Sequence, residues 1–128
     1  MAYYGVLEIG IGQTREDPAT TFLELAYGTI ELVLVQFPPG HAGLTRIQMY
    51  YNETQAFPRN PGEYYIGDDT VLSIPTRYPI HEKPLRLELV GWAPDATLAH
   101  NIHVEIALIE EALYLGPTAG PITLPEGV

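Results

Sequence analysis

The chain has 128 residues, 46% of them apolar, which is long and apolar enough for one domain with its own core. Sixteen acidic residues against six basic ones give a net charge of −10, which argues against partners such as nucleic acid or anionic membranes. The chain has no cysteine and therefore no disulfide bond, and no apolar run approaches the roughly 20 residues that span a bilayer. The first residues lack the basic region and apolar run of a secretory signal, so we expect none.

The chain opens with an apolar, β-prone segment at residues 3–11, closed by Gly10 and Gly12. Two interpretations stay open for it: an edge strand of the main sheet, or an arm that pairs with a neighbouring copy. Residues 20–27 then alternate as a strand would, and residues 29–37 form the next strand after a turn at Gly28. These two strands could form a tight hairpin.

The second of these strands is apolar on both sides. Ile30, Leu32 and Leu34 fall on one face, and Val33 and Val35 fall on the other. This pattern indicates a central strand that is covered on both faces.

Shorter strands and turns make up the middle of the chain. Residues 44–51 alternate, Asn52-Glu53 is typical of a two-residue turn, and residues 54–57 return as a strand. Residues 63–66 and 70–75 are predicted as two further strands. Residues 77–83 are predicted to be an irregular connection.

The clearest alternation lies at residues 85–92 and 101–110, which a loop at residues 93–100 joins. Counted with the others, they give about seven or eight strands without a convincing helix. The economical fold is all-β, an antiparallel β-sandwich with jelly-roll or Ig-like connections, and a closed barrel is the alternative.

The domain organisation follows from these elements. We predict an N-terminal arm or edge strand at residues 1–12, a β-sandwich domain at residues 13–115, and an extended tail rich in proline and glycine at residues 116–128. Such a tail is either disordered or docked on a partner.

The sequence offers little chemistry. His100, His103 and Glu105 resemble part of a cupin metal site, but residues three apart on a regular strand point to opposite faces. Asp68-Asp69 lacks the ligand series of a calcium loop, and Ser73, the only serine, lies inside a predicted strand. We therefore expect a protein that is not an enzyme and uses no metal or cofactor.

The nine tyrosines are more informative, because they include three adjacent pairs: Tyr3-Tyr4, Tyr50-Tyr51 and Tyr64-Tyr65. Adjacent strand residues point to opposite faces, so one tyrosine of each pair tends to leave the core. Exposed tyrosines are typical of protein contacts and of sugar-binding platforms. Trp92 ends a core strand, which favours packing over sugar stacking.

Three segments resemble a type of small β-sandwich protein from tailed-phage structural gene clusters. They are Phe-Pro-Pro-Gly-His-Ala-Gly-Leu-Thr at residues 37–45, Pro-Arg-Asn-Pro-Gly-Glu-Tyr at residues 58–64, and the matching parts of residues 91–104. The resemblance covers roughly residues 29–109. It implies a virion component made in the host cytoplasm, such as a capsid decoration protein, and it carries over no residue-level site.

Decoration proteins of this type are often trimers that hold capsid subunits together. The resemblance therefore implies a homo-oligomer that binds the major capsid protein or other virion subunits. An acidic chain suits the outside of a DNA-filled shell. We expect the contacts to come from apolar residues near both ends of the chain: Tyr3, Tyr4, Val6, Leu7, Ile9, Ile122, Leu124 and Val128. A carbohydrate-binding module that uses exposed tyrosines and Trp92 is the alternative, and a cupin-like metal enzyme is a third.

Overall fold

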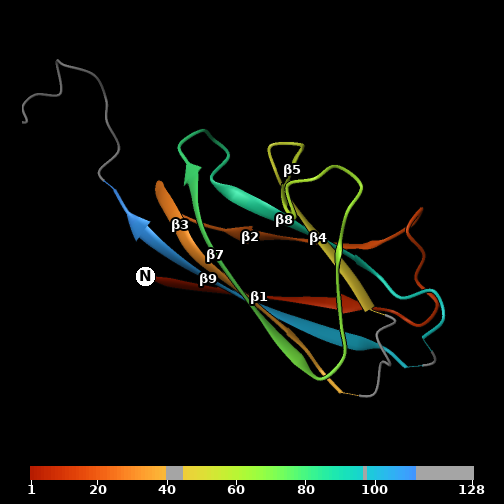
Figure 1. The fold of residues 1–128 in the computed structure, drawn as a ribbon. Helices are drawn as coiled ribbons and strands as arrows, with labels where there is room; N and C mark the ends of the chain where they lie inside the picture. The colour runs from red at the N-terminus through yellow and green to blue at the C-terminus, as the bar shows by residue number, and fades with distance from the viewer. Residues whose placement is uncertain (40–44, 97, 112–128) are drawn as a thin grey trace, which may run out of the picture.

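The computed structural model describes residues 1–39, 45–96 and 98–111, which form two antiparallel sheets packed face to face (Figure 1). These residues contain no helix. The strands are β1 (Ala2–Ile9), β2 (Ala19–Glu24), β3 (Gly28–Phe37), β4 (Thr45–Tyr51), β5 (Thr54–Phe57), β6 (Tyr65–Gly67), β7 (Thr70–Ile80), β8 (Arg86–Trp92) and β9 (His100–Glu110). The expected β-sandwich is confirmed.

The order of the strands distinguishes between the two expected topologies. Sheet A has the order β1-β9-β3-β7, and sheet B has the order β2-β8-β4-β5, with β6 also paired to β4. The pairing is nested: the first strand pairs with the last, β2 with β8, β3 with β7, and β4 with the short strands that follow it. This is the jelly-roll arrangement rather than the Ig-like one.

The core lies between the sheets and is built from alternate residues of each strand. In β9, the expected alternation is confirmed: Ile102, Val104, Ile106 and Leu108 are buried, whereas His103 faces outward. Leu87 and Leu89 of β8 are buried against them from sheet B. The two strands with the clearest alternation thus face each other across the core instead of sharing a sheet.

The expected hairpin between residues 20–27 and 29–37 is wrong, because β2 belongs to sheet B and β3 to sheet A. The chain crosses between the sheets in the three residues that follow Glu24. Leu25 N–H donates to the Leu85 carbonyl at 2.8 Å on one side, and the Tyr27 carbonyl accepts from Glu111 N–H at 2.9 Å on the other. Crossing in this way lets both strands bury an apolar face in the same core.

Strand β3 lies between β9 and β7, so its central position is confirmed. Its predicted faces are correct after Leu32, but grouping Ile30 with Leu32 and Leu34 is wrong, because the register shifts between Ile30 and Leu32. A β-bulge of this kind moves the following residues to the opposite face. Ile30 and Val33 are therefore both fully buried, and Leu34 lies half-buried on the outer face of sheet A.

Strand β7 runs to Ile80, so the irregular connection predicted at residues 77–83 is wrong over its first four residues. The strand contains two prolines, Pro75 and Pro79. Since β7 is an edge strand, it tolerates prolines whose nitrogen faces away from β3.

The turn at Asn52-Glu53 is confirmed. Both residues have positive φ angles, 49° and 69°, and Tyr51 pairs with Thr54 on either side of them. Beside this turn, the Tyr51 hydroxyl donates to the Glu82 carbonyl and accepts from Glu82 N–H at 2.8 Å. This pair of hydrogen bonds fixes the connection from β7 to β8 against sheet B.

Within the chain, β1 pairs with β9 along its whole length and lies at the edge of sheet A. Its start is fixed by the Tyr3 hydroxyl, which donates to the Glu110 carboxylate, and by the bonds between Met1 and Leu108. Across the described ranges, no helix is long and apolar enough to cross a membrane.

Candidate functional site

The outer face of sheet A carries apolar side chains from all four of its strands. Tyr4 and Val6 come from β1, with exposed fractions of 71% and 49%, and Val71 of β7 and Ile109 of β9 are exposed to 58% and 56%. Leu34 of β3 lies among them, half-buried. We call these five residues the contact face. Outward positions of an antiparallel sheet are typically polar, so five apolar side chains at such positions stand out from their polar neighbours.

A shallow hollow of about 230 Å³ lies within the contact face. Its walls include Tyr4, Val6, Leu34 and Val71, and polar groups of Gln36, His103 and Glu105 also line it. An apolar side chain from another protein could lie in this hollow with polar partners around it.

The structure divides the predicted contact residues into three groups. Tyr4 and Val6 lie on the contact face, and Tyr3 is half-buried beside Glu110. Leu7 and Ile9 are exposed to only 1% and 0% and belong to the core, so they cannot reach a partner in this fold. Ile122, Leu124 and Val128 lie outside the described residues.

Leu34, Val71 and Ile109 were not predicted. The bulge in β3 hid the outward position of Leu34. The sequence does carry a signal for Ile109, since Leu108 and Ile109 are adjacent apolar residues at the end of an alternating strand, and only one of them can face the core.

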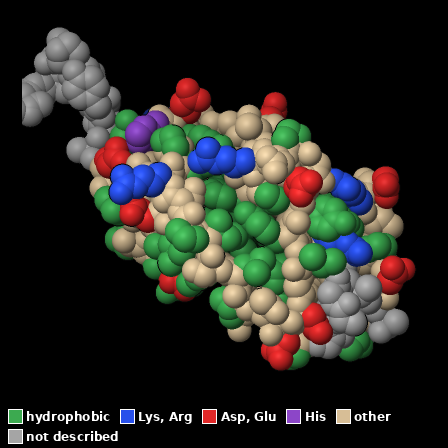
Figure 2. Space-filling view, viewed as in Figure 1, with side chains coloured by type: hydrophobic (Ala, Val, Ile, Leu, Met, Phe, Trp, Pro, Cys, Tyr) green, Lys and Arg blue, Asp and Glu red, His purple; other side chains and the backbone are tan. Residues whose placement is uncertain are grey.

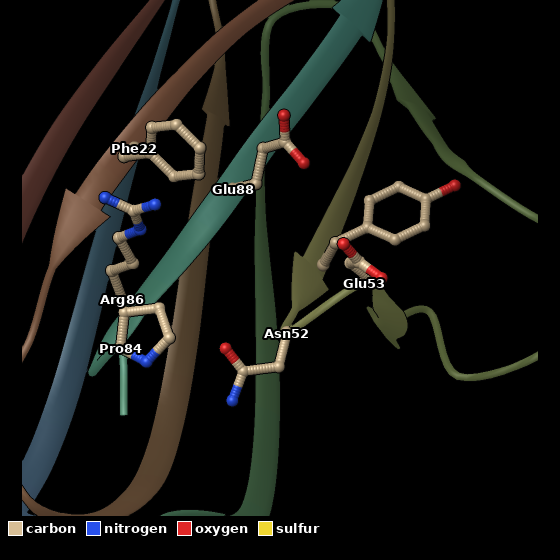
Figure 3. Close-up of a pocket in the computed structure, with 7 residues that line it drawn as sticks. Phe22, Asn52, Glu53, Pro84, Arg86 and Glu88 are labelled. Atoms are coloured by element: carbon tan, nitrogen blue, oxygen red, sulfur yellow. The ribbon is translucent and has the colours of Figure 1, made fainter. Parts of the chain in front are cut away.

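A groove of about 330 Å³ lies on the opposite side of the molecule, on the outer face of sheet B (Figure 3). Phe22, Arg86 and Glu88 project into it from β2 and β8, and Asn52 and Glu53 border it from the β4–β5 turn. The groove therefore combines aromatic, basic and acidic groups.

Two aromatic side chains, Phe22 and Tyr50, line this groove, and the Phe22 ring is covered on one face. The Arg86 guanidinium carbon lies 3.9 Å from the centre of the Phe22 ring, as a cation–π contact, and Arg86 Nη1 also lies 4.0 Å from Glu24 Oε2. One face of the ring is thus occupied by Arg86 and is not free to stack on a sugar.

Trp92 is only 3% exposed, which confirms the packing interpretation. Its ring lies edge-on to Tyr64, with 5.4 Å between the centroids, and the Arg15 guanidinium lies 5.0 Å from the centre of the indole. This cluster holds the segment before β6 over the outer face of sheet B. A sugar platform made from Trp92 is therefore excluded in this fold.

The tyrosine pairs behave as predicted. Tyr4 is exposed where Tyr3 is half-buried, and Tyr51 is buried where Tyr50 is half-buried. Tyr64 is exposed and packs on Trp92, whereas Tyr65 turns toward the core. Burial of the Tyr65 side chain raises the pKa of its hydroxyl above the usual value.

His100 and His103 face opposite sides of sheet A, as the spacing predicted. His100 is buried at the start of β9, and this burial lowers the pKa of its imidazole, although a hydrogen bond with the backbone of Ala99 opposes the shift. His103 faces outward beside Glu105. Among residues 1–39, 45–96 and 98–111, no three acidic or histidine side chains gather as a metal site would need.

Charge is sparse in the middle of the side shown in Figure 2. Apolar side chains gather there, around the region that β7 crosses in Figure 1, and most carboxylates and basic groups lie toward the rim. Such a distribution is typical of surfaces whose centre is covered by another protein.

The chain matches no known protein-family model and no curated protein sequence.

Proposed function

We propose that this protein is a non-enzymatic structural subunit that works by binding another protein through its contact face. The observation that carries the proposal is that exposed apolar side chains from β1, β7 and β9, and the half-buried Leu34 of β3, lie on one sheet face. Burying such a face removes apolar area from water, at about 25 cal/mol for each Å².

The sequence resemblance suggests which partner this is. Decoration proteins of tailed phages bind the outside of the capsid, so the major capsid protein or another virion subunit is the proposed partner. The net charge of −10 supports an outer position, because an acidic chain is repelled by the packaged DNA.

The test uses purified empty shells of the major capsid protein that is proposed as the partner. The wild-type chain should sediment with the shells. Val71→Glu combined with Ile109→Glu should abolish co-sedimentation, because it places two charges in the contact face. Both side chains are more than half exposed, so the fold should tolerate the change.

The matched control is Phe22→Glu, which introduces a charge at a 51% exposed position on the outer face of sheet B. It should bind the shells as the wild type does. Failure of the wild type to bind would contradict the proposal, as would loss of binding in Phe22→Glu with retention in the contact-face variant.

Carbohydrate binding is the second candidate, and the groove of Figure 3 favours it, because Asn52, Glu53, Arg86 and Glu88 offer hydrogen-bond partners that sugars use. It ranks below protein contact because Arg86 covers one face of the Phe22 ring and Tyr50, the other aromatic residue of the groove, is half-buried. A glycan array should show binding that Glu88→Gln abolishes if this function is real, and an array without hits would remove it.

A further inference from the structure

The outer edge of β1 carries backbone groups that no strand pairs with among the described residues. Met1 and Leu108 exchange two hydrogen bonds, of 3.1 and 2.9 Å, between their backbone groups. Hydrogen-bonded residues alternate along an antiparallel ladder, so Tyr3, Gly5 and the odd-numbered residues after them face β9. The N–H and C=O groups of Ala2, Tyr4, Val6 and Glu8 therefore point away from β9.

The β7 edge of sheet A is protected against pairing with a further strand, whereas the β1 edge is not. Pro75 and Pro79 leave the outer edge of β7 without donors at two positions, and Arg77 adds a charge between them. Strand β1 contains no proline, and Glu8 is its only charged residue in a chain of net charge −10. Of the two edge strands that the structure describes in sheet A, β1 is therefore the one better suited to pair with a further strand.

We propose that β1 pairs antiparallel with β1 of a second copy of this chain, so that sheet A continues across a two-fold axis. Pairing β1 with β7 of another copy would build a ring or an open-ended filament, and the prolines of β7 disfavour it. Pairing β1 with itself closes at two copies. The inference goes beyond the proposed function, because it concerns a backbone edge and a second copy rather than a virion partner.

The sequence of β1 selects the register. With Gly5 on the axis, Tyr4 of one copy lies opposite Val6 of the other, and Ala2 lies opposite Glu8. All four outward residues of each copy then exchange hydrogen bonds with the other copy. The ring of each Tyr4 lies beside the smaller Val6 side chain, and the two Glu8 carboxylates are at opposite ends of the paired strands. Other registers leave some of these backbone groups unpaired.

Two consequences follow from this geometry. The two-fold axis is perpendicular to sheet A, so the contact faces of the two copies join on the same side. The edge of one eight-residue strand buries less than the roughly 800 Å² per partner of a standard interface, so the dimer should dissociate on dilution. A closed dimer also departs from the trimer that the resemblance implies.

The first experiment uses the absence of cysteine from the full chain. Tyr4→Cys and Val6→Cys are made separately and mixed in a glutathione redox buffer. Directly opposed hydrogen-bonded residues have Cα atoms about 5.5 Å apart, within the range that a disulfide bridges. The mixture should form a disulfide-linked heterodimer, whereas each variant alone, and Tyr4→Cys mixed with Val71→Cys, should give only background.

The second experiment measures the weight-average mass by light scattering over a concentration series. The wild type and Val6→Ala should rise toward twice the chain mass. Val6→Pro removes only an outward N–H, so it should keep the strand signal in circular dichroism and stay at the mass of one chain.

Several results would overturn the inference. A wild type that stays monomeric at every concentration would do so, as would a mixture of the two cysteine variants that links no faster than the controls. Linking of Tyr4→Cys alone as fast as the mixture would refute the register. None of these results bears on shell binding, whose variants lie on β7 and β9.

Discussion

At the scale of single residues, burial of His100 ties the stability of the fold to pH. Its imidazole is 7% exposed, and this burial holds its pKa below the usual value of 6.5. The unfolded chain therefore takes up a proton at a higher pH than the folded chain does. The resulting contribution to the free energy of unfolding is fully present above about pH 6.5 and is lost as the pH falls toward the lowered pKa of the folded state.

The variant His100→Gln should show a smaller fall in the free energy of unfolding between pH 7.5 and 5 than the wild type, because glutamine does not titrate. Denaturant unfolding at the two pH values measures this difference, and the shared effect of the sixteen acidic residues cancels in the comparison. If both proteins lost stability in parallel, His100 would not be the group that titrates.

The alternation of side chains along β1 decides which of the predicted contact residues reach the surface. Tyr4 and Val6 were predicted and lie on the contact face, whereas Leu7 and Ile9 were predicted and are buried. Glu8 marks the outward row of β1, so strict alternation separates Val6 from its two buried neighbours. Leu7 and Ile9 were wrongly predicted as contact residues because all the apolar residues of this segment were assigned to one surface.

At the scale of elements, the sequence predicted the turns and strands that depend on residues close together in the chain. The Asn52-Glu53 turn and the alternation in β8 and β9 could be located from residues that are close in sequence. The bulge after Ile30 and the crossing after Glu24 could not, because each depends on strands far away in the chain. The same holds for Pro79, which is compatible with a strand only because β7 is an edge.

Two glycines provide a test of how closely the strands approach. A Cβ atom at Gly28 would lie 2.2 Å from the Ile109 carbonyl oxygen of the paired strand β9, a contact that only backbone movement can relieve. Gly28→Ala should therefore lower the free energy of unfolding by about 2 kcal/mol or more.

Gly5→Ala is the matched control, since a Cβ atom there meets Leu23 and Leu89 at an ordinary 3.4 Å. It should lie within about 1 kcal/mol of the wild type, because alanine restricts the unfolded chain. Denaturant unfolding compares the two variants, and equal losses would contradict the close approach of β3 and β9.

At the scale of the whole molecule, the jelly roll does not select a function. The same architecture occurs in capsid proteins, lectins and cupins, so the argument for function depends on surfaces. The two outer faces differ in kind. The contact face of sheet A exposes several apolar side chains beside polar ones, whereas charged and polar groups line the groove over sheet B, where Arg86 covers one face of the Phe22 ring. The proposed function, which is binding of another protein, uses the contact face of sheet A.

The central claim is that this chain is a structural subunit of a particle. Under this proposal a phage carries the gene, and the most direct measurement is quantitative mass spectrometry of the purified particles of that phage. We predict a fixed ratio between this chain and the major capsid protein that survives repeated density-gradient purification. Its absence from the particles, or a content that falls with each round of purification, would contradict the claim.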